Sequence, residues 1–214
     1  VHTFCCAVPG CWHVMGVTQA AGLSLKWFRD NLAEKYKEEA VIKGVDVYDL
    51  INEDVKKVPI GSRRLIYLPY LMGERSPHND PMARATFTGI TMDTSRSDMT
   101  QAVLEGVAFA IRDSFEVAKK LGMNITNATL CGGGAKSPLW RKIIANVLNV
   151  DINIPQVEEG PSMGAAMLAM VAAGAYPSVK AAADAICRVS ETVKPDAQIA
   201  ERYEEKYRNF TGIY

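Results

Sequence analysis

The sequence lacks an excess of charge of either sign. Its 214 residues include 24 Lys and Arg and 24 Asp and Glu, so the formal net charge is zero. Proteins that hold nucleic acid or an anionic membrane by electrostatic attraction usually carry a surplus of basic side chains. We therefore expect neither nucleic acid nor a membrane among the partners of this chain.

Residues that bind metals are also scarce. The chain has three histidines and five cysteines, and the cysteines form no CxxC pair and have no histidine at the spacing of a zinc site. The cysteines are Cys5, Cys6, Cys11, Cys131 and Cys187. Their odd number and irregular spacing are typical of reduced thiols, so we expect a cytoplasmic protein whose residues form no metal site.

Long apolar runs are missing as well. The most apolar segment, residues 163–173, is far shorter than the ~20 residues that a membrane-spanning helix needs. No basic segment precedes an apolar stretch near the start, so a secretion signal is not expected. The chain instead opens on residues 1–8, a strand-like pattern without a polar lead-in, which suggests a piece of a longer protein.

Apolar periodicity predicts strands and helices that alternate along the chain. The expected strands cover residues 12–17, 65–71, 128–131 and 151–154. The expected helices cover residues 22–36, 98–121, 137–148 and 160–174, and two more follow, the last from Asp196. Residues 34–57 are polar and predict one small peripheral helix, and residues 73–85 predict a long loop. This alternation indicates an α/β fold with a central sheet flanked by helices.

Two of the expected helices have features of their own. Helix 98–121 carries a single apolar stripe, and we expect Ser97 to cap it and Gly122 to end it. Helix 160–174 is apolar almost all round and rich in small residues, which is typical of a buried helix that neighbouring backbone approaches closely. We expect its start, residues 164–166, to contact the glycine segment described next.

Residues 128–140 join an expected strand to an expected helix through three consecutive glycines. Ser137 suits the N-cap and Pro138 the first helical position, where its missing N–H costs nothing. Glycines at such a corner let backbone approach a ligand, and the helix N-terminus behind them offers unpaired N–H groups. The pattern predicts a nucleotide site, although a tight turn whose glycines serve only chain geometry has the same sequence.

A more specific pattern lies at residues 85–90, Ala-Thr-Phe-Thr-Gly-Ile, followed after seven residues by Asp-Met-Thr-Gln-Ala-Val-Leu-Glu at 98–105. It resembles the C-terminal signature of the FGGY carbohydrate kinases. The glycine triplet and residues 160–166 fall where that family has its adenosine-binding loop and a helix beside the nucleotide. The resemblance covers essentially the whole chain.

The resemblance implies an actin-like, ribonuclease H-like fold of two domains that close on a cleft. Residues 1–214 resemble the C-terminal domain, which holds most of the ATP, and Mg²⁺ would bridge the phosphates. The aspartate base and the glycine-threonine turn for the terminal phosphates are expected upstream of Val1, with most sugar contacts. This chain then supplies no catalytic residue and is inactive alone, and a homodimer of the full-length protein stays open.

The family pattern also assigns the nucleotide contacts. They are Gly22, Lys26, Gly132, Gly133, Gly134, Ala135 and Ser137. Gly22 and Lys26 match nucleotide-contacting positions of glycerol kinases, where an amide stands in place of the lysine. Lys26 would meet a phosphate as a point charge or remain a solvated lysine on a helix.

The loop at residues 73–78, Gly-Glu-Arg-Ser-Pro-His, is similar to the xylulokinase branch of the family. We expect Glu74 and Arg75 to pair at the edge of the cleft, and His78 to face substrate or solvent. A surface loop ordered by prolines and an ion pair is the other interpretation.

The resemblance therefore implies ATP-dependent phosphorylation of a pentulose, with D-xylulose as the first choice. Gluconate, ribulose or another ketose is the alternative within the family. An actin-like module that binds nucleotide without catalysis is a hypothesis from another class, and a purely structural interaction domain is a third.

Overall fold

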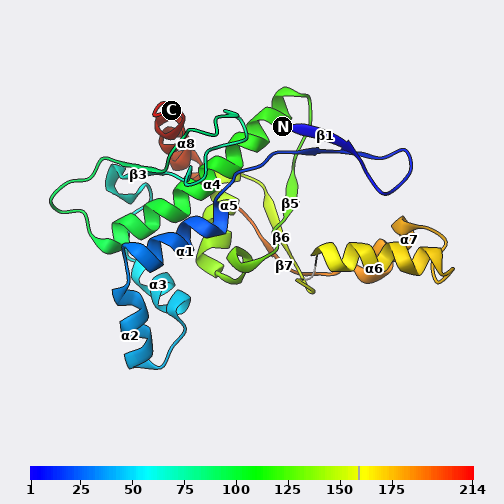
Figure 1. Cartoon of the computed structure of the whole chain (residues 1–214), viewed down its shortest axis with the longest axis horizontal. Coiled ribbons are helices and arrows are strands. Elements are labelled where there is room, and N and C mark those ends of the chain that lie inside the picture. Colours follow the sequence, from blue (N-terminus) through cyan, green and yellow to red (C-terminus); the bar gives the residue numbers. More distant parts are fainter. Residues whose placement is uncertain (159) are drawn as a thin grey trace.

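The computed structural model describes residues 1–158 and 160–214 and confirms an α/β fold (Figure 1). The helices are α1 (Ala21–Asn31), α2 (Lys35–Lys43), α3 (Val47–Val55), α4 (Arg96–Lys120), α5 (Pro138–Leu148), α6 (Gly160–Ala172), α7 (Val179–Ile186) and α8 (Ala197–Thr211). The strands are β1 (His2–Cys5), β2 (Trp12–Met15), β3 (Ile66–Leu68), β4 (Thr86–Thr88), β5 (Asn127–Thr129), β6 (Asp151–Pro155) and β7 (Val189–Val193). Two short 3₁₀ turns, η1 (Ser62–Arg64) and η2 (Gly133–Lys136), complete the order.

The strands form three groups. The order β5-β6-β7 makes a three-stranded sheet in which β5 and β6 are parallel and β6 and β7 antiparallel. The pairs β1–β2 and β3–β4 are antiparallel and separate from that sheet. Parallel strands need a crossover connection, and η2 and α5 form the one between β5 and β6. The glycine triplet lies at the start of this crossover.

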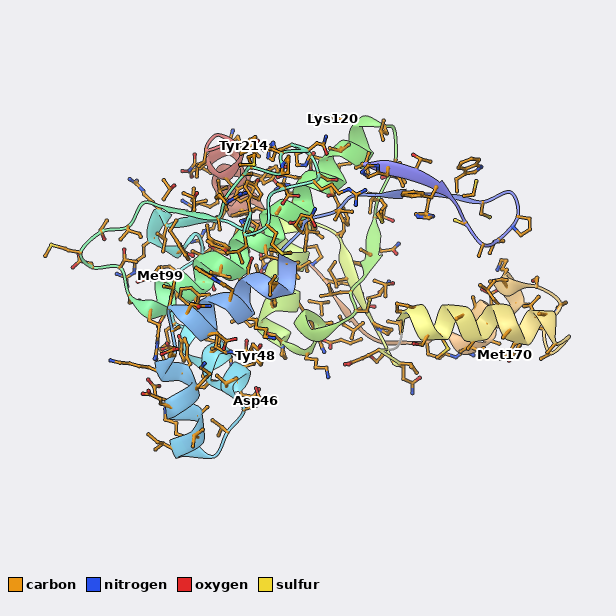
Figure 2. All side chains as sticks on the ribbon, in the orientation of Figure 1. Asp46, Tyr48, Met99, Lys120, Met170 and Tyr214 are labelled. Carbon is orange, nitrogen blue, oxygen red and sulfur yellow. The ribbon has the colours of Figure 1, made fainter. Side chains whose placement is uncertain are left out.

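The long helix α4 is the centre of the core (Figure 1). Its apolar stripe packs with α5, α8 and β3 around fully buried side chains such as Val103, Leu104 and Tyr203. Trp140 on α5 donates its Nε1–H to the carbonyl oxygen of Leu104, at 3.1 Å. In Figure 2, Met99 and Lys120 mark the two ends of α4. The core therefore fixes α5, and with it the corner that precedes α5.

The N-cap of α4 is Ser95 and not Ser97. Ser95 Oγ accepts the Asp98 N–H at 3.1 Å, and Asp98 Oδ2 accepts the Ser95 N–H at 2.9 Å, which makes a capping box. Ser97 instead donates its hydroxyl to Asp54 Oδ2 at 2.7 Å. Only Ser95 has an acidic residue three positions later to complete the box. Gly122, with φ +84°, follows the helix end as expected.

Other boundaries differ from the periodicity. The predicted helix 22–36 ends at Asn31, whose side-chain amide bonds to the Trp27 carbonyl oxygen, and Tyr36 belongs to α2. Residues 34–57 hold two helices where one was expected. The strand predicted at 65–71 is only β3, since Pro69 cannot donate to a strand ladder. The short strands β4 and β7 were not predicted.

The expectation that helix 160–174 is buried is wrong. In α6 no side chain is buried, and Figure 1 shows α6 and α7 side by side, projecting beyond the three-stranded sheet. A Cβ added at Gly164 would meet nothing within 4 Å, and Ala165 and Ala166 are exposed. Figure 2 places Met170 in this arm, far from Tyr214. An apolar pattern indicates that burial of a helix is favourable, but it does not specify which element covers the helix.

Candidate nucleotide-binding site

The glycine corner, Gly132–Gly134, lies between β5 and α5. Its backbone requires glycine at Gly132 and leaves open space beside Gly132 and Gly133. Gly132 has φ 86° and ψ −176°, a conformation that is essentially restricted to glycine. Residues 133–136 then form η2, with the Ala135 N–H donating to the Gly132 carbonyl oxygen at 2.9 Å. A Cβ added at Gly132 or Gly133 would meet no atom within 4 Å. The corner therefore presents bare backbone on an open side.

The N-terminus of α5 is capped as the sequence predicts. Ser137 Oγ accepts the Trp140 N–H at 3.1 Å, and Pro138 occupies the first helical position. The same hydroxyl donates to Asn52 Oδ1 on α3 at 2.7 Å. The cap thus also joins the corner to α3, and Asn52 is a neighbour that the sequence patterns did not indicate. An anion at this helix N-terminus would meet a favourable dipole.

Two side chains of α5 fix the inner side of the corner. The ring of Trp140 lies where a Cβ at Gly134 would come within 3.2 Å of it. Arg141 Nε donates to the Ala135 carbonyl oxygen, and its Nη1 lies 2.7 Å from Glu191 Oε2 on β7. The sequence analysis assigned neither role. The available indication was the spacing, since Trp140 and Arg141 follow the cap residue Ser137 by three and four positions, which places them on the same face of the helix as the cap.

On the outer side, Lys136 forms an ion pair with Glu158, with 3.3 Å between Nζ and Oε2. Ala135 is buried beneath the turn. The second motif begins nearby, because a Cβ at Gly160 would lie 3.9 Å from Cys131 Sγ. In the motif at residues 160–166, Gly160 and Met163 line one cavity with Cys131, whereas Ala165 and Ala166 are exposed and a Cβ at Gly164 would meet nothing, so the contact expected of residues 164–166 is not seen.

Gly22 and Lys26 lie on α1. The N-cap of α1 is Ala20, which offers no side-chain cap, and a Cβ at Gly22 would meet nothing within 4 Å. Lys26 is exposed and forms no ion pair within residues 1–158 and 160–214. Among the described residues, no hydrogen bond joins Gly22 or Lys26 to the glycine corner. Their nucleotide contacts stay predictions.

Glu74 does not pair with Arg75 through its side chain, which corrects the expectation. Its carboxylate is buried and accepts the Thr18 hydroxyl at 3.0 Å and the N–H groups of Arg75 and Ser76 at 2.8 and 3.1 Å. Burial raises the pKa of Glu74, and these hydrogen bonds oppose the rise. Arg75 Nε instead donates to His2 Nε2 at 3.1 Å. The carboxylate turns inward because the loop backbone supplies its donors.

His78 lies in an aromatic cluster. Its Nε2 is 3.3 Å from the Tyr70 hydroxyl, and its ring centroid is 3.9 Å from that of Tyr214. Partial burial lowers the pKa of His78. Tyr214 also donates its hydroxyl to Asp80 in the same loop. The loop is therefore fastened to the C-terminal residue and to β1, and contact of its side chains with substrate remains a prediction.

Two residues of the signature at 85–105, Gly89 and Glu105, have structural roles in this fold. Gly89 has φ +93°, and a Cβ there would lie 2.7 Å from the Arg64 carbonyl oxygen. Glu105 is 2% exposed, and its carboxylate accepts four hydrogen bonds, from Gly61 N–H, the Ser62 hydroxyl, the Gln101 amide and the Tyr203 hydroxyl. Burial raises its pKa. Glu105 thus holds the turn at residues 61–64, where three non-glycine residues have positive φ.

The described residues hold no group of three or more His, Cys, Asp or Glu side chains placed to bind a metal ion. The described helices also include none with the length and apolar character that crossing a membrane requires.

Sequence comparison finds relatives among kinases of sugars. Residues 1–173 match the FGGY family of carbohydrate kinases, C-terminal domain. The chain is 34% identical over its full length to the xylulose kinase of Staphylococcus epidermidis and 33% identical to that of Bacillus subtilis. It is 32% identical over 82% of its length to the gluconokinase of Bacillus subtilis. The chain spans 41% of each of these xylulose kinases.

Structural comparison agrees. A xyloylose kinase from Brucella ovis superposes with a TM-score of 0.83 at 36% identity, covering all of this chain and 41% of the other. A gluconate kinase from Lactobacillus acidophilus superposes with a TM-score of 0.79 at 27% identity, over 92% of this chain and 38% of the other. The chain belongs to the FGGY family of carbohydrate kinases, and it corresponds to their C-terminal domain.

Proposed function

We propose that this chain is the nucleotide-binding part of a cytoplasmic, ATP-dependent sugar kinase that phosphorylates a pentulose, with D-xylulose as the first choice. The observation that carries the proposal is the open backbone at Gly132 and Gly133 beside the capped N-terminus of α5. Open backbone next to a helix N-terminus suits a nucleotide, because N–H groups and the positive end of the helix dipole favour anionic ligands there.

The choice of sugar rests on the relatives. In sequence, the xylulose kinases of Staphylococcus epidermidis and Bacillus subtilis match all of this chain, whereas the Bacillus subtilis gluconokinase match covers 82% of it. Gluconate therefore remains the second candidate substrate, and ribulose or another ketose stays open. The sugar would be held mainly by residues upstream of Val1, as would the aspartate that accepts the proton of the sugar hydroxyl.

Phosphoryl transfer depends mostly on positioning and on neutralising charge at the phosphates. Within residues 1–158 and 160–214 no cluster of side chains is placed to hold Mg²⁺, so the residues described do not themselves fit the ion. The proposed Mg²⁺ would enter with the nucleotide. The part of this chain is to hold and orient ATP.

Calorimetry with ATP, ADP and GTP tests the proposal. We expect weak binding of ATP and ADP and no comparable binding of GTP, because the corner lies in this chain while the turn for the terminal phosphates is expected upstream of Val1. Equal binding of GTP would contradict the assignment of the corner to adenine nucleotides. Absence of ATP binding would favour a purely structural interaction domain.

Turnover separates the kinase from an actin-like module that binds without catalysis. We expect no D-xylulose-dependent release of ADP from this chain alone, since general-base catalysis needs a carboxylate at the sugar hydroxyl. A longer chain that includes the preceding sequence should release ADP with D-xylulose faster than with D-ribulose or D-gluconate. Turnover by the short chain itself would contradict the upstream base, and binding without turnover by the longer chain would favour the non-catalytic module.

A further inference from the structure

Two thiols lie opposite each other at the tip of the β1–β2 hairpin, which Figure 1 shows projecting from the fold. Cys5 pairs with Trp12, so the next residues toward the turn, Cys6 and Cys11, are cross-strand neighbours. The Cys6 N–H donates to the Cys11 carbonyl oxygen at 2.9 Å. Directly opposed residues have Cα atoms about 5.5 Å apart, inside the ~4.4–6.8 Å that a disulfide spans.

An imidazole completes the group. Cys6 Sγ lies 3.6 Å from His13 Nδ1, within hydrogen-bond distance for sulfur, so the thiol can donate its proton to the ring. His13 is two residues beyond Cys11 and therefore on the same face of the hairpin. Its ring stacks on Phe4, with centroids 5.5 Å apart and planes at 26°. The ring is thus held at the thiol by an aromatic neighbour.

The remaining cysteines differ from this pair. Cys5 pairs with Trp12 and projects from the opposite face of the hairpin, since successive strand residues alternate. Cys131 and Cys187 line one apolar cavity of about 260 Å³ beside α6. Among the described cysteines, a hydrogen bond to an imidazole is seen only for Cys6. The hairpin therefore combines a nucleophile, a partner thiol and a base.

We propose that Cys6 and Cys11 are a redox-responsive dithiol, which hydrogen peroxide converts to an intrachain disulfide with His13 as the base for Cys6. The inference does not depend on the kinase activity. His13 accepts the Cys6 proton and the thiolate attacks a peroxide oxygen, so the O–O bond breaks and a sulfenic acid forms. The departing hydroxide takes the proton from His13 and leaves as water.

Cys11 then attacks the Cys6 sulfur and the S–O bond breaks. The hydroxide that leaves takes the Cys11 proton and becomes a second water. In sum, two thiols are oxidised and one peroxide is reduced, giving one disulfide and two waters. The two half-cystines close the turn at residues 7–10, whose Gly10 has φ +77° and already folds the chain back.

Thiol titration after limiting hydrogen peroxide tests the proposal on the purified chain. We expect two of the five free cysteines to be lost first, with no disulfide-linked dimer. The tryptic peptide 1–26 should lose two hydrogens in mass. That peptide holds Cys5, Cys6 and Cys11 and has no internal Lys or Arg, so variants must assign the bond.

Cys6→Ser and Cys11→Ser should each abolish the mass loss in peptide 1–26, and Cys5→Ser is the matched control that should retain it. His13→Asn should slow formation of the disulfide roughly tenfold or more, because the base is removed. Earlier modification of Cys131 or Cys187, retention of the bond in Cys11→Ser, or an unchanged rate in His13→Asn would each overturn the proposal.

Discussion

The glycine corner and the α6–α7 arm are both built from small residues, yet they differ in what surrounds them. At the corner, Trp140 and Arg141 contact the backbone from within and Ser137 bonds to α3. In α6 no side chain is buried, and the helix lies alongside α7. The comparison teaches that small residues permit close packing but that large neighbours decide whether it occurs.

The largest expected effect is at Trp140. The side chain is 5% exposed and donates to the Leu104 carbonyl oxygen, so Trp140→Ala leaves a cavity and removes this hydrogen bond. We expect a loss of about 3–5 kcal/mol in the free energy of unfolding. Leu168→Ala in the arm, at 38% exposure, should cost less than about 0.5 kcal/mol. Urea denaturation measures the change in unfolding free energy for both variants. Equal losses would contradict the claim that the corner is packed and the arm is not.

Glu105→Gln tests whether the buried carboxylate of Glu105 holds the turn at residues 61–64. The amide of Gln would place donor hydrogens against groups that now donate to the carboxylate. We expect a loss of about 2–3 kcal/mol, since hydrogen bonds to a charged group are replaced by a mismatch. The exposed Glu201 on α8 provides the control, because Glu201→Gln removes a solvated charge. A loss at Glu105 no greater than at Glu201 would show that the carboxylate does not hold the turn.

The buried side chain of Asp113 on α4 predicts that the free energy of unfolding depends on pH. Burial raises the pKa of Asp113 from 3.8 to about 6, although it accepts the Tyr207 hydroxyl at 2.6 Å. The fold therefore favours the protonated form, so its contribution to stability is present below about pH 4 and is lost as the pH rises to about 6.

Relative to Asp113→Asn, the parent should lose about 2 kcal/mol of unfolding free energy between about pH 4 and 6.5. Asp184→Asn in α7, where the aspartate is exposed, is the control in the arm and should follow the parent at every pH. Denaturation curves across this range provide the comparison. A constant difference between the parent and Asp113→Asn would contradict the raised pKa.

The smallest effect is expected at Ala165. Because the sequence predicts a buried helix, it also predicts that Ala165→Leu overpacks the core and lowers the free energy of unfolding by roughly 1–3 kcal/mol. Since Ala165 is exposed, we expect Ala165→Leu to change the melting temperature and ATP binding little. Ala145→Leu on α5, at a residue with 0% exposure, should lose the roughly 1–3 kcal/mol of unfolding free energy that overpacking causes. A large loss at Ala165 would mean that another element covers the arm.

Local signals in the sequence predicted what depends on neighbours along the chain. Ser137 and Pro138 identified the start of α5, and the stripe of α4 followed from its spacing. Two of the failures depend on distant parts of the chain: Glu74 accepts the hydroxyl of Thr18, and α6 is exposed despite its apolar pattern. The N-cap of α4 is a local failure, because the box between Ser95 and Asp98 spans only three residues. The strand β7 pairs with β6, but its residues are mostly exposed, so its sequence lacks the alternating apolar residues that identified β6.

The candidate site was predictable to a similar extent. The glycines and the cap followed from sequence, whereas the contacts of Trp140 and Arg141 appear only once α5 is folded back on the corner. The role of Glu105 was hidden because its partners at residues 61 and 62 lie more than forty positions away, at separations of 44 and 43.

The most direct test of the nucleotide assignment substitutes an open glycine of the corner. A Cβ at Gly133 meets no protein atom within 4 Å, so Gly133→Val should leave the melting temperature near that of the parent. The matched control is Gly164→Val in α6, where a Cβ also meets nothing. Calorimetry should show ATP affinity reduced about tenfold or more, ~1.4 kcal/mol, in Gly133→Val alone. Unchanged affinity in Gly133→Val would contradict the claim that nucleotide lies against this backbone.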